Sequence, residues 1–451
     1  MSEFIIIIPP YLIDKNKRTI IPNKAMLPTG PLSIASSLRN IGHKVKVIDL
    51  VFEKIWNEKL NLNFNNDTHI LISCHTIRNI ESCKAILHEL KKKRFKGHTT
   101  IGGNACIELG IKEFSKLGLK AQTVLRGYSH GLIDKIIDKI TGDIFPTRSE
   151  IAKELALPAI DLLDSIILNK YLKKSQNRYP IIGHGYGCVY DCAYCTADIN
   201  SRWINRPLKE VDKEIKLAKE LGYNHLWCVD NLILVNPEHT IEFDRLVTKA
   251  RLTWSGMNRA ELTIKHCNVL PKLKSLRSLA MGVETLSSKQ LKEFNRKTNI
   301  DIYSEAFHLT NKANISSTAF VMLDCPNTDE NDFWNLYNYL NNDLNPNKVS
   351  ISFYNPPPTE GLFKLGLKPI DYGFYKWPLG LSKLNSEKIV QQAMIMCGTW
   401  WSGWKLNKTK PFFNNKTEFG VNFKQGKIFQ KNNDRSPLGD VWNIWKKRIA
   451  V

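Results

Sequence analysis

The chain has 451 residues, a length that accommodates two or three domains. It carries 64 Lys and Arg against 43 Asp and Glu, so its net charge is +21. Such a balance suits nucleic acid, anionic lipid or acidic substrates as partners, but codon bias also explains Lys, Asn and Ile spread over every segment. The apolar run at 4–8 is too short for a membrane span of roughly 20 residues or for a secretory signal. We therefore expect a cytoplasmic protein.

Residues 1–140 alternate β-rich runs with helical stretches, which predicts βαβ units and an open parallel sheet covered on both faces. The predicted strands are 4–8, 44–49, 69–74, 99–101 and 122–125, and the clearest helices are 31–41, 80–94 and 132–140. Ligands of such sheets bind beyond the carboxyl ends of the strands. Residues 141–177 are predicted to be a connector.

A second alternating series begins at residue 178. Its predicted strands are 179–183, 225–229, 254–257, 279–283, 316–322 and 348–353. The helix at 207–221 is well marked, because Pro207 suits a first helical position and apolar residues recur on one face. Six strands each followed by a helix favour a partial barrel over 178–385. Residues 386–451, rich in Trp and in basic residues, are predicted to form a small C-terminal extension.

Three cysteines lie in eight residues directly after the first strand of the second series. Cys188, Cys192 and Cys195 have the spacing CxxxCxxC, whereas the other seven cysteines are scattered and are read as core residues. Three thiolates can serve three irons of a four-iron cluster and leave the fourth iron open for chemistry. A zinc site completed by His184 is the alternative.

This motif, with the aromatic Tyr194 before its last cysteine, resembles the signature of the radical S-adenosylmethionine (SAM) superfamily. The resemblance extends over about 178–385 and implies a [4Fe–4S] cluster on Cys188, Cys192 and Cys195 that cleaves SAM reductively. It also implies an external one-electron reductant of the flavodoxin or ferredoxin type. The residues that it assigns to SAM are Tyr194, Asp230, Asn231, Glu284 and Pro326.

Two of these assignments have structural alternatives. Asp230 could be a helix cap and Glu284 a carboxylate satisfied within the barrel. The sequence also departs from the family at the segment expected beside the adenine. There the usual Gly-Leu-Pro-Gly is replaced by Asp324-Cys325-Pro326-Asn327, following Leu323.

The N-terminal half resembles the cobalamin-binding, Rossmann-like domains that are fused to radical SAM barrels. The likeness is carried by 28–32, 35–39 and 42–49, and it places cobalamin near Pro28, Ser73, His75, Gly102, Gly103 and Gly127. The Asp-x-His-x-x-Gly motif that supplies a histidine below cobalt is absent, so histidine ligation is not expected. His75 and Arg78 are the side chains expected nearest the lower face. A purely structural sheet is the alternative.

These likenesses imply a cobalamin-dependent methyltransferase that acts on an unactivated carbon of a small molecule or peptide, such as a natural product. They leave open a cobalamin-binding cyclase or rearrangement enzyme and a cobalamin-free radical SAM enzyme. The charge and the basic aromatic tail leave open an iron–sulfur protein that binds nucleic acid, although nucleic acid is not the expected partner.

Overall fold

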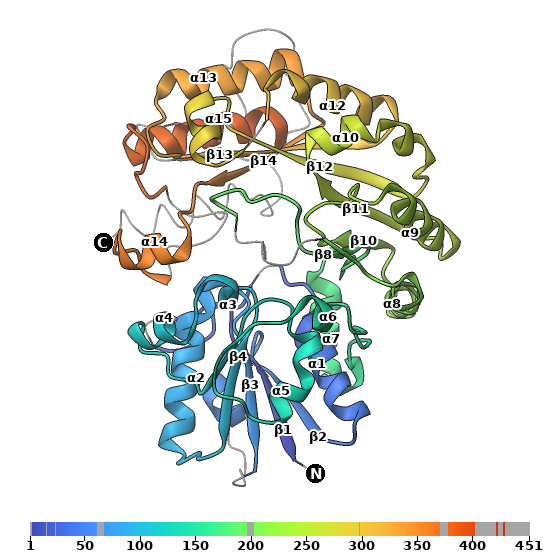
Figure 1. Ribbon diagram of the computed structural model, residues 1–451. Coiled ribbons are helices and arrows are strands. Elements are labelled where there is room, and N and C mark those ends of the chain that lie inside the picture. The colour runs from blue at the N-terminus through green and yellow to red at the C-terminus, as the bar shows by residue number, and fades with distance from the viewer. Residues whose placement is uncertain are drawn as a thin grey trace. The chain divides into compact units, whose positions relative to one another are not determined.

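Figure 1 shows the computed structural model of the chain. It describes residues 2–14, 16–22, 24–60, 67–195, 203–296, 298–369, 378–401, 421–422 and 427–428. Contacts group the chain into two compact units. The first comprises Met1–Met257, Lys272–Arg277 and Pro356–Ile370, and the second comprises Asn258–Pro271, Ser278–Asn355 and Asp371–Val451. The domain boundaries predicted above follow the sheets rather than these units and stay predictions.

The first sheet is open and has six parallel strands in the order β2-β1-β3-β4-β5-β6. Its strands are β1 (Glu3–Ile8), β2 (Lys44–Asp49), β3 (His69–Ser73), β4 (His98–Gly102), β5 (Thr123–Leu125) and β6 (Gly142–Ile144). Its helices are α1 (Thr29–Asn40), α2 (Ile80–Lys92), α3 (Ala105–Glu108), α4 (Ile111–Lys116), α5 (Ile133–Ile137), α6 (Arg148–Ile151) and α7 (Ser165–Lys174). Short 3-10 turns are η1 (Trp56–Leu60), η2 (Ile77–Asn79), η3 (Ser129–Leu132) and η4 (Ile160–Leu162).

The sequence explains where these strands lie. Residues 4–8 of β1 are all buried, as expected for an inner parallel strand covered on both faces. Phe4 and Ile6 share a core with Ala35 and Leu38 of α1 and Ile136 of α5, while α2 lies on the other face (Figure 1). Strand β2 lies at the edge of the sheet, and its first four residues alternate between exposed and half-buried side chains, beginning with the exposed Lys44. Charged side chains on an edge strand protect it from pairing with another strand.

The segment 141–177, predicted as a connector, contains a strand that the sequence did not reveal. Three residues of β6 offer too short a pattern to recognise, yet they pair with β5 in register. Helix α7 then returns to the first sheet, because the Tyr171 hydroxyl donates to Asp49 Oδ2 at 2.7 Å at the end of β2. Packing between Phe52 and Tyr171 reinforces this attachment.

The second sheet has the order β14-β13-β12-β11-β10-β7, and its pairs β7–β10, β10–β11, β12–β13 and β13–β14 are parallel. Its strands are β7 (Arg178–Ile181), β10 (His225–Cys228), β11 (Thr253–Asn258), β12 (Leu276–Glu284), β13 (Ser316–Leu323) and β14 (Lys348–Phe353). Its larger helices are α8 (Leu208–Glu220), α9 (Pro237–Lys249), α12 (Asp301–Lys312), α13 (Glu330–Tyr339) and α15 (Ser386–Trp401). Shorter elements are α10 (Ala260–Lys265), η5 (Cys267–Lys272), α11 (Ser288–Glu293), the π-helical turn η6 (Leu340–Leu344) and α14 (Pro358–Phe363).

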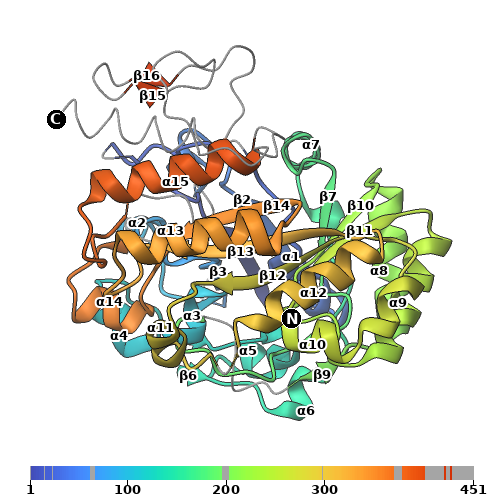
Figure 2. The same cartoon turned by 90° about the horizontal axis from the view of Figure 1, so that it is seen from above.

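This strand order confirms the predicted fold class, an open parallel sheet followed by a partial barrel. Within the second unit, α12, α13 and α15 cover one face of β12–β14, as Figure 2 shows from above. Pro207 caps α8 rather than starting it. Beyond residue 401 only the short hairpin β15 (Val421–Asn422) and β16 (Lys427–Ile428) is described, so most of the predicted extension lies outside the described residues. Among the described helices, none is both long and apolar enough to cross a membrane.

The buried carboxyl of Asp49 makes stability depend on pH. Burial raises its pKa to about 6, despite hydrogen bonds from Tyr171 and Val51 that act in the opposite direction. A raised pKa means that the folded chain holds this proton more tightly, so the contribution is present below about pH 4 and is lost as pH rises through 6. We predict that Asp49→Asn abolishes a decline of about 3 kcal/mol between pH 4 and 7. Thermal unfolding across that range, with Asp161→Asn as an exposed control, measures it. Parallel curves for Asp49→Asn and wild type would contradict the prediction.

Candidate functional site

The cysteine motif lies in a short antiparallel hairpin that follows the first barrel strand. After β7, strand β8 (Gly185–Tyr186) pairs with β9 (Ile204–Asn205), and the loop between them carries the motif. We call residues 187–195 the cluster loop; residues 196–202 lie outside the described part. Cys188 and Cys192 are half-buried and Cys195 is exposed, while the Cys195 amide donates to the Cys192 carbonyl at 3.0 Å. One loop thus presents the three thiols, with Tyr194 half-buried among them.

Asp230 holds the chain immediately before the cluster loop. It follows β10 and is 3% exposed. Its carboxylate accepts three successive backbone amides, from Gly183 at 2.8 Å, His184 at 2.7 Å and Gly185 at 2.8 Å. Burial opposes its ionisation, but bonds from His184, Cys228 and Gly183 outweigh this effect and leave the pKa of the carboxyl below its usual value. The arrangement supports a loop-positioning role for Asp230, and the residue that caps α9 is Asn236 instead. The predicted SAM contact of Asp230 is not tested by these distances.

His184 and Cys228 complete this buried network. The His184 Nδ1 atom lies 3.4 Å from Cys228 Sγ and 3.6 Å from Asp230 Oδ1, and Cys228 Sγ donates to Asp230 Oδ2 at 2.9 Å. The His184 ring packs against Phe243 and Trp254 in the core. Burial and the neighbouring carboxylate raise the pKa of the Cys228 thiol, so it stays a neutral donor. Although these three side chains are close enough to surround an ion, the carboxylate is already saturated by donors. These contacts involve only His184 Nδ1, because its buried Nε2 has no hydrogen-bond partner among the described residues, and they do not decide the zinc alternative considered above.

A buried ion pair supports the other strand of the hairpin. Arg206, 0% exposed, donates to the Ile182 carbonyl at 2.6 Å and pairs with Glu214 of α8 at 2.6 Å. The Tyr179 hydroxyl of β7 donates to the same carboxylate at 3.1 Å. Burial lowers the pKa of Arg206, but Glu214 and its other neighbours outweigh that effect and raise it. The hairpin therefore rests on a paired charge rather than an isolated one.

The first residue of the cluster loop is held from both sides. The Gly187 amide donates to the Tyr128 hydroxyl at 3.0 Å, and Asn231 Nδ2 donates to the Gly187 carbonyl at 3.3 Å. Asn231 was predicted to contact SAM, and the structure places it against the loop that carries Cys188. Tyr128 was not predicted, because nothing in the sequence links the loop after β5 to a motif some sixty residues later.

In the second unit, Glu284 ends β12 in a left-handed conformation with φ 64°. Its Oε1 atom lies 3.4 Å from Arg296 Nη1, and Arg296 also donates to the Gly282 carbonyl and, at 3.2 Å, to the Tyr303 hydroxyl. A side chain at Gly282 would place its Cβ 2.2 Å from Glu284 Oε1. Gly282 thus leaves the space that the carboxylate occupies, in keeping with the alternative of a carboxylate satisfied within the barrel. The predicted contact of Glu284 with SAM is not tested by these distances.

The segment expected beside adenine contains two residues with positive φ angles, and neither of them is glycine. Asp324 has φ 59° and Asn327 has φ 64°, the left-handed region that Asp and Asn tolerate better than other side chains. The Asp324 carboxylate accepts backbone amides from Gly380, Leu381 and Ser382 at 2.8–2.9 Å. Pro326, the predicted adenine contact, accepts a hydrogen bond from Gln290 through its carbonyl.

In the first sheet, most of the residues predicted to contact cobalamin gather at the carboxyl ends of neighbouring strands. Ser73 ends β3, Gly102 ends β4 and Gly127 follows β5, whereas Pro28 precedes α1. Because the chain leaves β1 for β2 on one side and β3 lies on the other, the point where the strand order reverses is between β1 and β3. Asn79 spans that point by donating to the Pro10 carbonyl at 2.9 Å.

Two details at this edge concern ligand binding. A Cβ at Gly103 would lie 2.5 Å from the Cys74 carbonyl oxygen, so close backbone packing already explains that glycine. In contrast, Arg78 has a buried Nε with no hydrogen-bond partner among the described residues, and burial lowers the pKa of its guanidinium. The side chain of His75 is exposed to solvent at this edge. An unsatisfied donor beside the reversal point fits a polar ligand.

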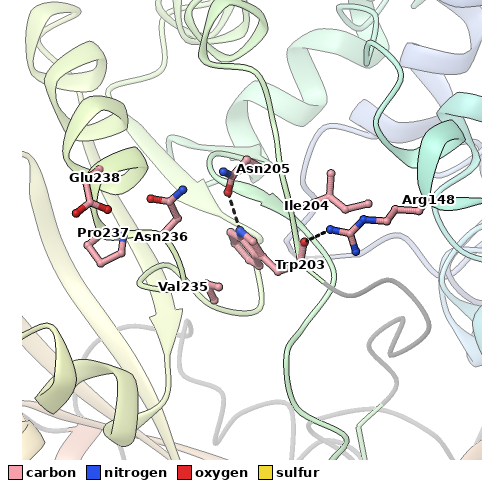
Figure 3. A pocket seen from close by; sticks show the side chains of 8 residues that line it. All are labelled: Arg148, Trp203, Ile204, Asn205, Val235, Asn236, Pro237 and Glu238. Atoms are coloured by element: carbon pink, nitrogen blue, oxygen red, sulfur yellow. Dashed lines mark hydrogen bonds between the residues drawn. The ribbon is translucent and has the colours of Figure 1, made fainter.

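A pocket of about 520 Å³ opens beside the hairpin that carries the cluster loop (Figure 3). Trp203 forms one wall, with its Nε1 donating to Asn205 Oδ1 at 2.8 Å and its carbonyl accepting from Arg148 at 3.2 Å. The start of α9, at Asn236 and Pro237, forms another wall. None of these residues was predicted, because they have no motif in common.

Comparison with known proteins agrees with this geometry. Residues 182–340 match the radical SAM superfamily model. Over 306 residues, 62% of this chain and 47% of the relative, the chain is 25% identical to the anaerobic magnesium-protoporphyrin IX monomethyl ester cyclase of Cereibacter sphaeroides. It is 21% identical to the hopanoid C-3 methylase of Methylococcus capsulatus over 68% of this chain and 62% of that protein. The chain thus spans less than two thirds of both relatives.

The fold is also similar to that of the radical SAM methyltransferase TsrM from Kitasatospora setae. The TM-score is 0.59 at 13% identity, over 87% of this chain and 83% of TsrM. Another TsrM structure contains cobalamin and a [4Fe–4S] cluster. Residues 182–340 are thus similar to the radical SAM domain, and an open parallel sheet precedes them in the sequence.

The two carboxylates that each bind three backbone amides permit a matched test. We predict that Asp230→Asn and Asp324→Asn each destabilise the chain by roughly 2 to 4 kcal/mol, because an amide nitrogen would then face a backbone donor. Only Asp230→Asn should also reduce iron uptake, since only Asp230 holds the segment before the cluster loop. Calorimetry and iron analysis after anaerobic reconstitution measure both effects. Normal stability with weakened SAM binding in Asp230→Asn would instead assign Asp230 to the cofactor.

Proposed function

We propose that the protein is a cobalamin-dependent radical SAM methyltransferase that modifies an unactivated carbon. The observation that carries the proposal is the placement of three cysteines on one hairpin loop of a radical SAM domain that follows a separate Rossmann-like sheet. A methylase and a methyltransferase are similar to the chain over 68% and 87% of its length, respectively. Cytoplasmic location is part of the proposal, because iron–sulfur chemistry requires reduced thiols.

The thiol set of the cluster loop fits a four-iron cluster. Three thiols lie on one loop at the spacing CxxxCxxC, and Nδ1 of the buried His184 faces Asp230 and Cys228. When bound, the cluster would supply one electron for reductive cleavage of SAM, and cobalamin would carry the methyl group. Cys188, Cys192 and Cys195 would bind the cluster, while Asp230 and Asn231 keep their loop in place. Glu284 and Pro326 would orient SAM from β12 and the segment after β13.

The first sheet supports the cobalamin part of the proposal. Its edge at the β1–β3 reversal carries Ser73 and His75, and Arg78 keeps a buried donor available for a polar group of the ligand. Histidine is a common metal ligand, so the role of His75 needs a direct measurement. We propose that no histidine coordinates the cobalt, because the Asp-x-His-x-x-Gly motif is absent from the sequence.

The substrate class that suits this chemistry is a peptide or natural-product-type small molecule, with a flavodoxin or ferredoxin as reductant. Ring closure is a second candidate, favoured by the 25% identity to a cyclase. Product analysis distinguishes the two, because methylation adds one carbon to the substrate while ring closure leaves its carbon count unchanged.

The cluster assignment makes a direct prediction. Anaerobic reconstitution should give about four irons per chain, with the reduced cluster's electron paramagnetic resonance spectrum changing when SAM is added. Replacing Cys188, Cys192 or Cys195 by Ala should abolish the cluster, because each would remove one iron ligand. Cys267→Ala, a half-buried cysteine outside the motif, is the control. One tightly bound zinc in place of iron would refute the radical SAM proposal.

Cobalamin binding is tested separately. The folded protein should bind cobalamin, and the spectrum of its cob(II)alamin form should lack splitting from an axial imidazole and be unchanged in His75→Ala. Arg78→Ala should weaken cobalamin binding by about tenfold, as expected for loss of one charged hydrogen bond. Arg18→Ala, an arginine exposed at the surface, is the matched control. Splitting that disappears in His75→Ala would make His75 a ligand, and failure to bind would favour the cobalamin-free enzyme.

A further inference from the structure

Tyr186, two residues before Cys188, is buried against the loop that follows β5. Its ring meets Tyr128 edge-on at 4.9 Å and stacks on His130 at 4.9 Å. His130 is itself fixed, because its Nε2 lies 2.9 Å from the Ile151 carbonyl, and burial lowers its pKa so that the ring is neutral. Ile151 and Ile204 complete this small apolar cluster. The loop after β5 and the hairpin of the cluster loop therefore share one core.

Two hydrogen bonds also hold Gly187, the residue between Tyr186 and Cys188. Tyr128 accepts the Gly187 amide at 3.0 Å, while Asn231 donates to the Gly187 carbonyl at 3.3 Å. Gly187 has φ 86°, so the chain turns at this residue in a conformation that glycine adopts readily. With both polar groups of Gly187 held, the Cα of Cys188 has little freedom to move. One of the two restraints comes from Tyr128, next to Gly127 of the first sheet's ligand edge.

We propose that Tyr128 is a positioning residue for the iron–sulfur cluster. Its hydroxyl holds the amide N–H of Gly187, the residue before the first predicted ligand Cys188, so the loop after β5 acts on the cluster through this hydrogen bond. This inference rests on the proposed function, because it requires that Cys188 bind iron. Ligand orientation by groups outside the ligand set alters the affinity and electronic properties of metal centres. A ligand bound at Gly127 would therefore influence the cluster through the adjacent Tyr128.

The test compares Tyr128→Phe with wild type and with Tyr171→Phe. Tyr128→Phe keeps the ring that contacts Tyr186 and removes the hydroxyl that accepts the Gly187 amide. Tyr171→Phe removes a hydrogen bond of 2.7 Å in the same unit, to Asp49, that does not touch the cluster loop. All three proteins are reconstituted anaerobically, and iron loss to a chelator, the midpoint potential and the reduced-state spectrum are measured.

Tyr128→Phe should retain its fold, lose iron about fivefold faster, as expected for one hydrogen bond of about 1 kcal/mol, and show a shifted midpoint potential and spectrum. Tyr171→Phe should match wild type in all three cluster measurements even if its melting temperature falls. Wild-type cluster properties in Tyr128→Phe, or the same changes in both variants, would overturn the positioning role. Absence of any cluster in the wild-type protein would instead refute the proposed function, so the two failures are distinguishable.

Discussion

The hydrogen bonds from three successive backbone amides to the Asp230 carboxylate are the interaction on which the site depends. A parallel strand that ends at the barrel edge leaves backbone donors without strand partners, and unpaired buried donors are costly. Asp230 satisfies those of Gly183, His184 and Gly185 at once. The cluster loop begins two residues later, so its starting direction is fixed before any cysteine is reached. His184 and Cys228 lock the carboxylate from its other side.

The same physical solution recurs at the end of β13. Asp324 binds three amides of 380–382, the segment that leads into α15, and the Lys383 amide donates to the Thr328 carbonyl nearby. Both carboxylates lie at carboxyl ends of parallel strands, where side chains that meet ligands or loops concentrate. In each case one charged group organises several backbone donors, which is stronger than the same number of neutral bonds. The barrel thus uses acidic residues to shape loops as well as to offer binding groups.

Patterns confined to a few adjacent residues were predictable. No distant partner is needed to recognise the buried run of 4–8, the helix at 207–221 with its single apolar face, or the CxxxCxxC motif. The order of strands and helices along the chain was enough to predict both parallel sheets. The remainder depends on tertiary contacts. Strand β6 is recognisable only from its pairing with β5, and each strand of the β8–β9 hairpin has only two residues. The hydrogen bond from Gly187 to Tyr128 joins residues that are far apart in the sequence. Asp230 shows the limit within a motif, because its position was recognised while its three amide partners were not.

The segment at 324–327 shows why a changed motif need not mean a changed backbone. Replacing both glycines of Gly-Leu-Pro-Gly would normally prevent positive φ angles, but Asp and Asn are the side chains that tolerate them best. Asp324 and Asn327 adopt 59° and 64°, and the Asp324 carboxylate gains partners that glycine could not provide. The substitution therefore keeps the turn and adds an anchor for 380–382. The segment thus holds the chain that enters α15, and its contact with SAM through Pro326 stays a prediction.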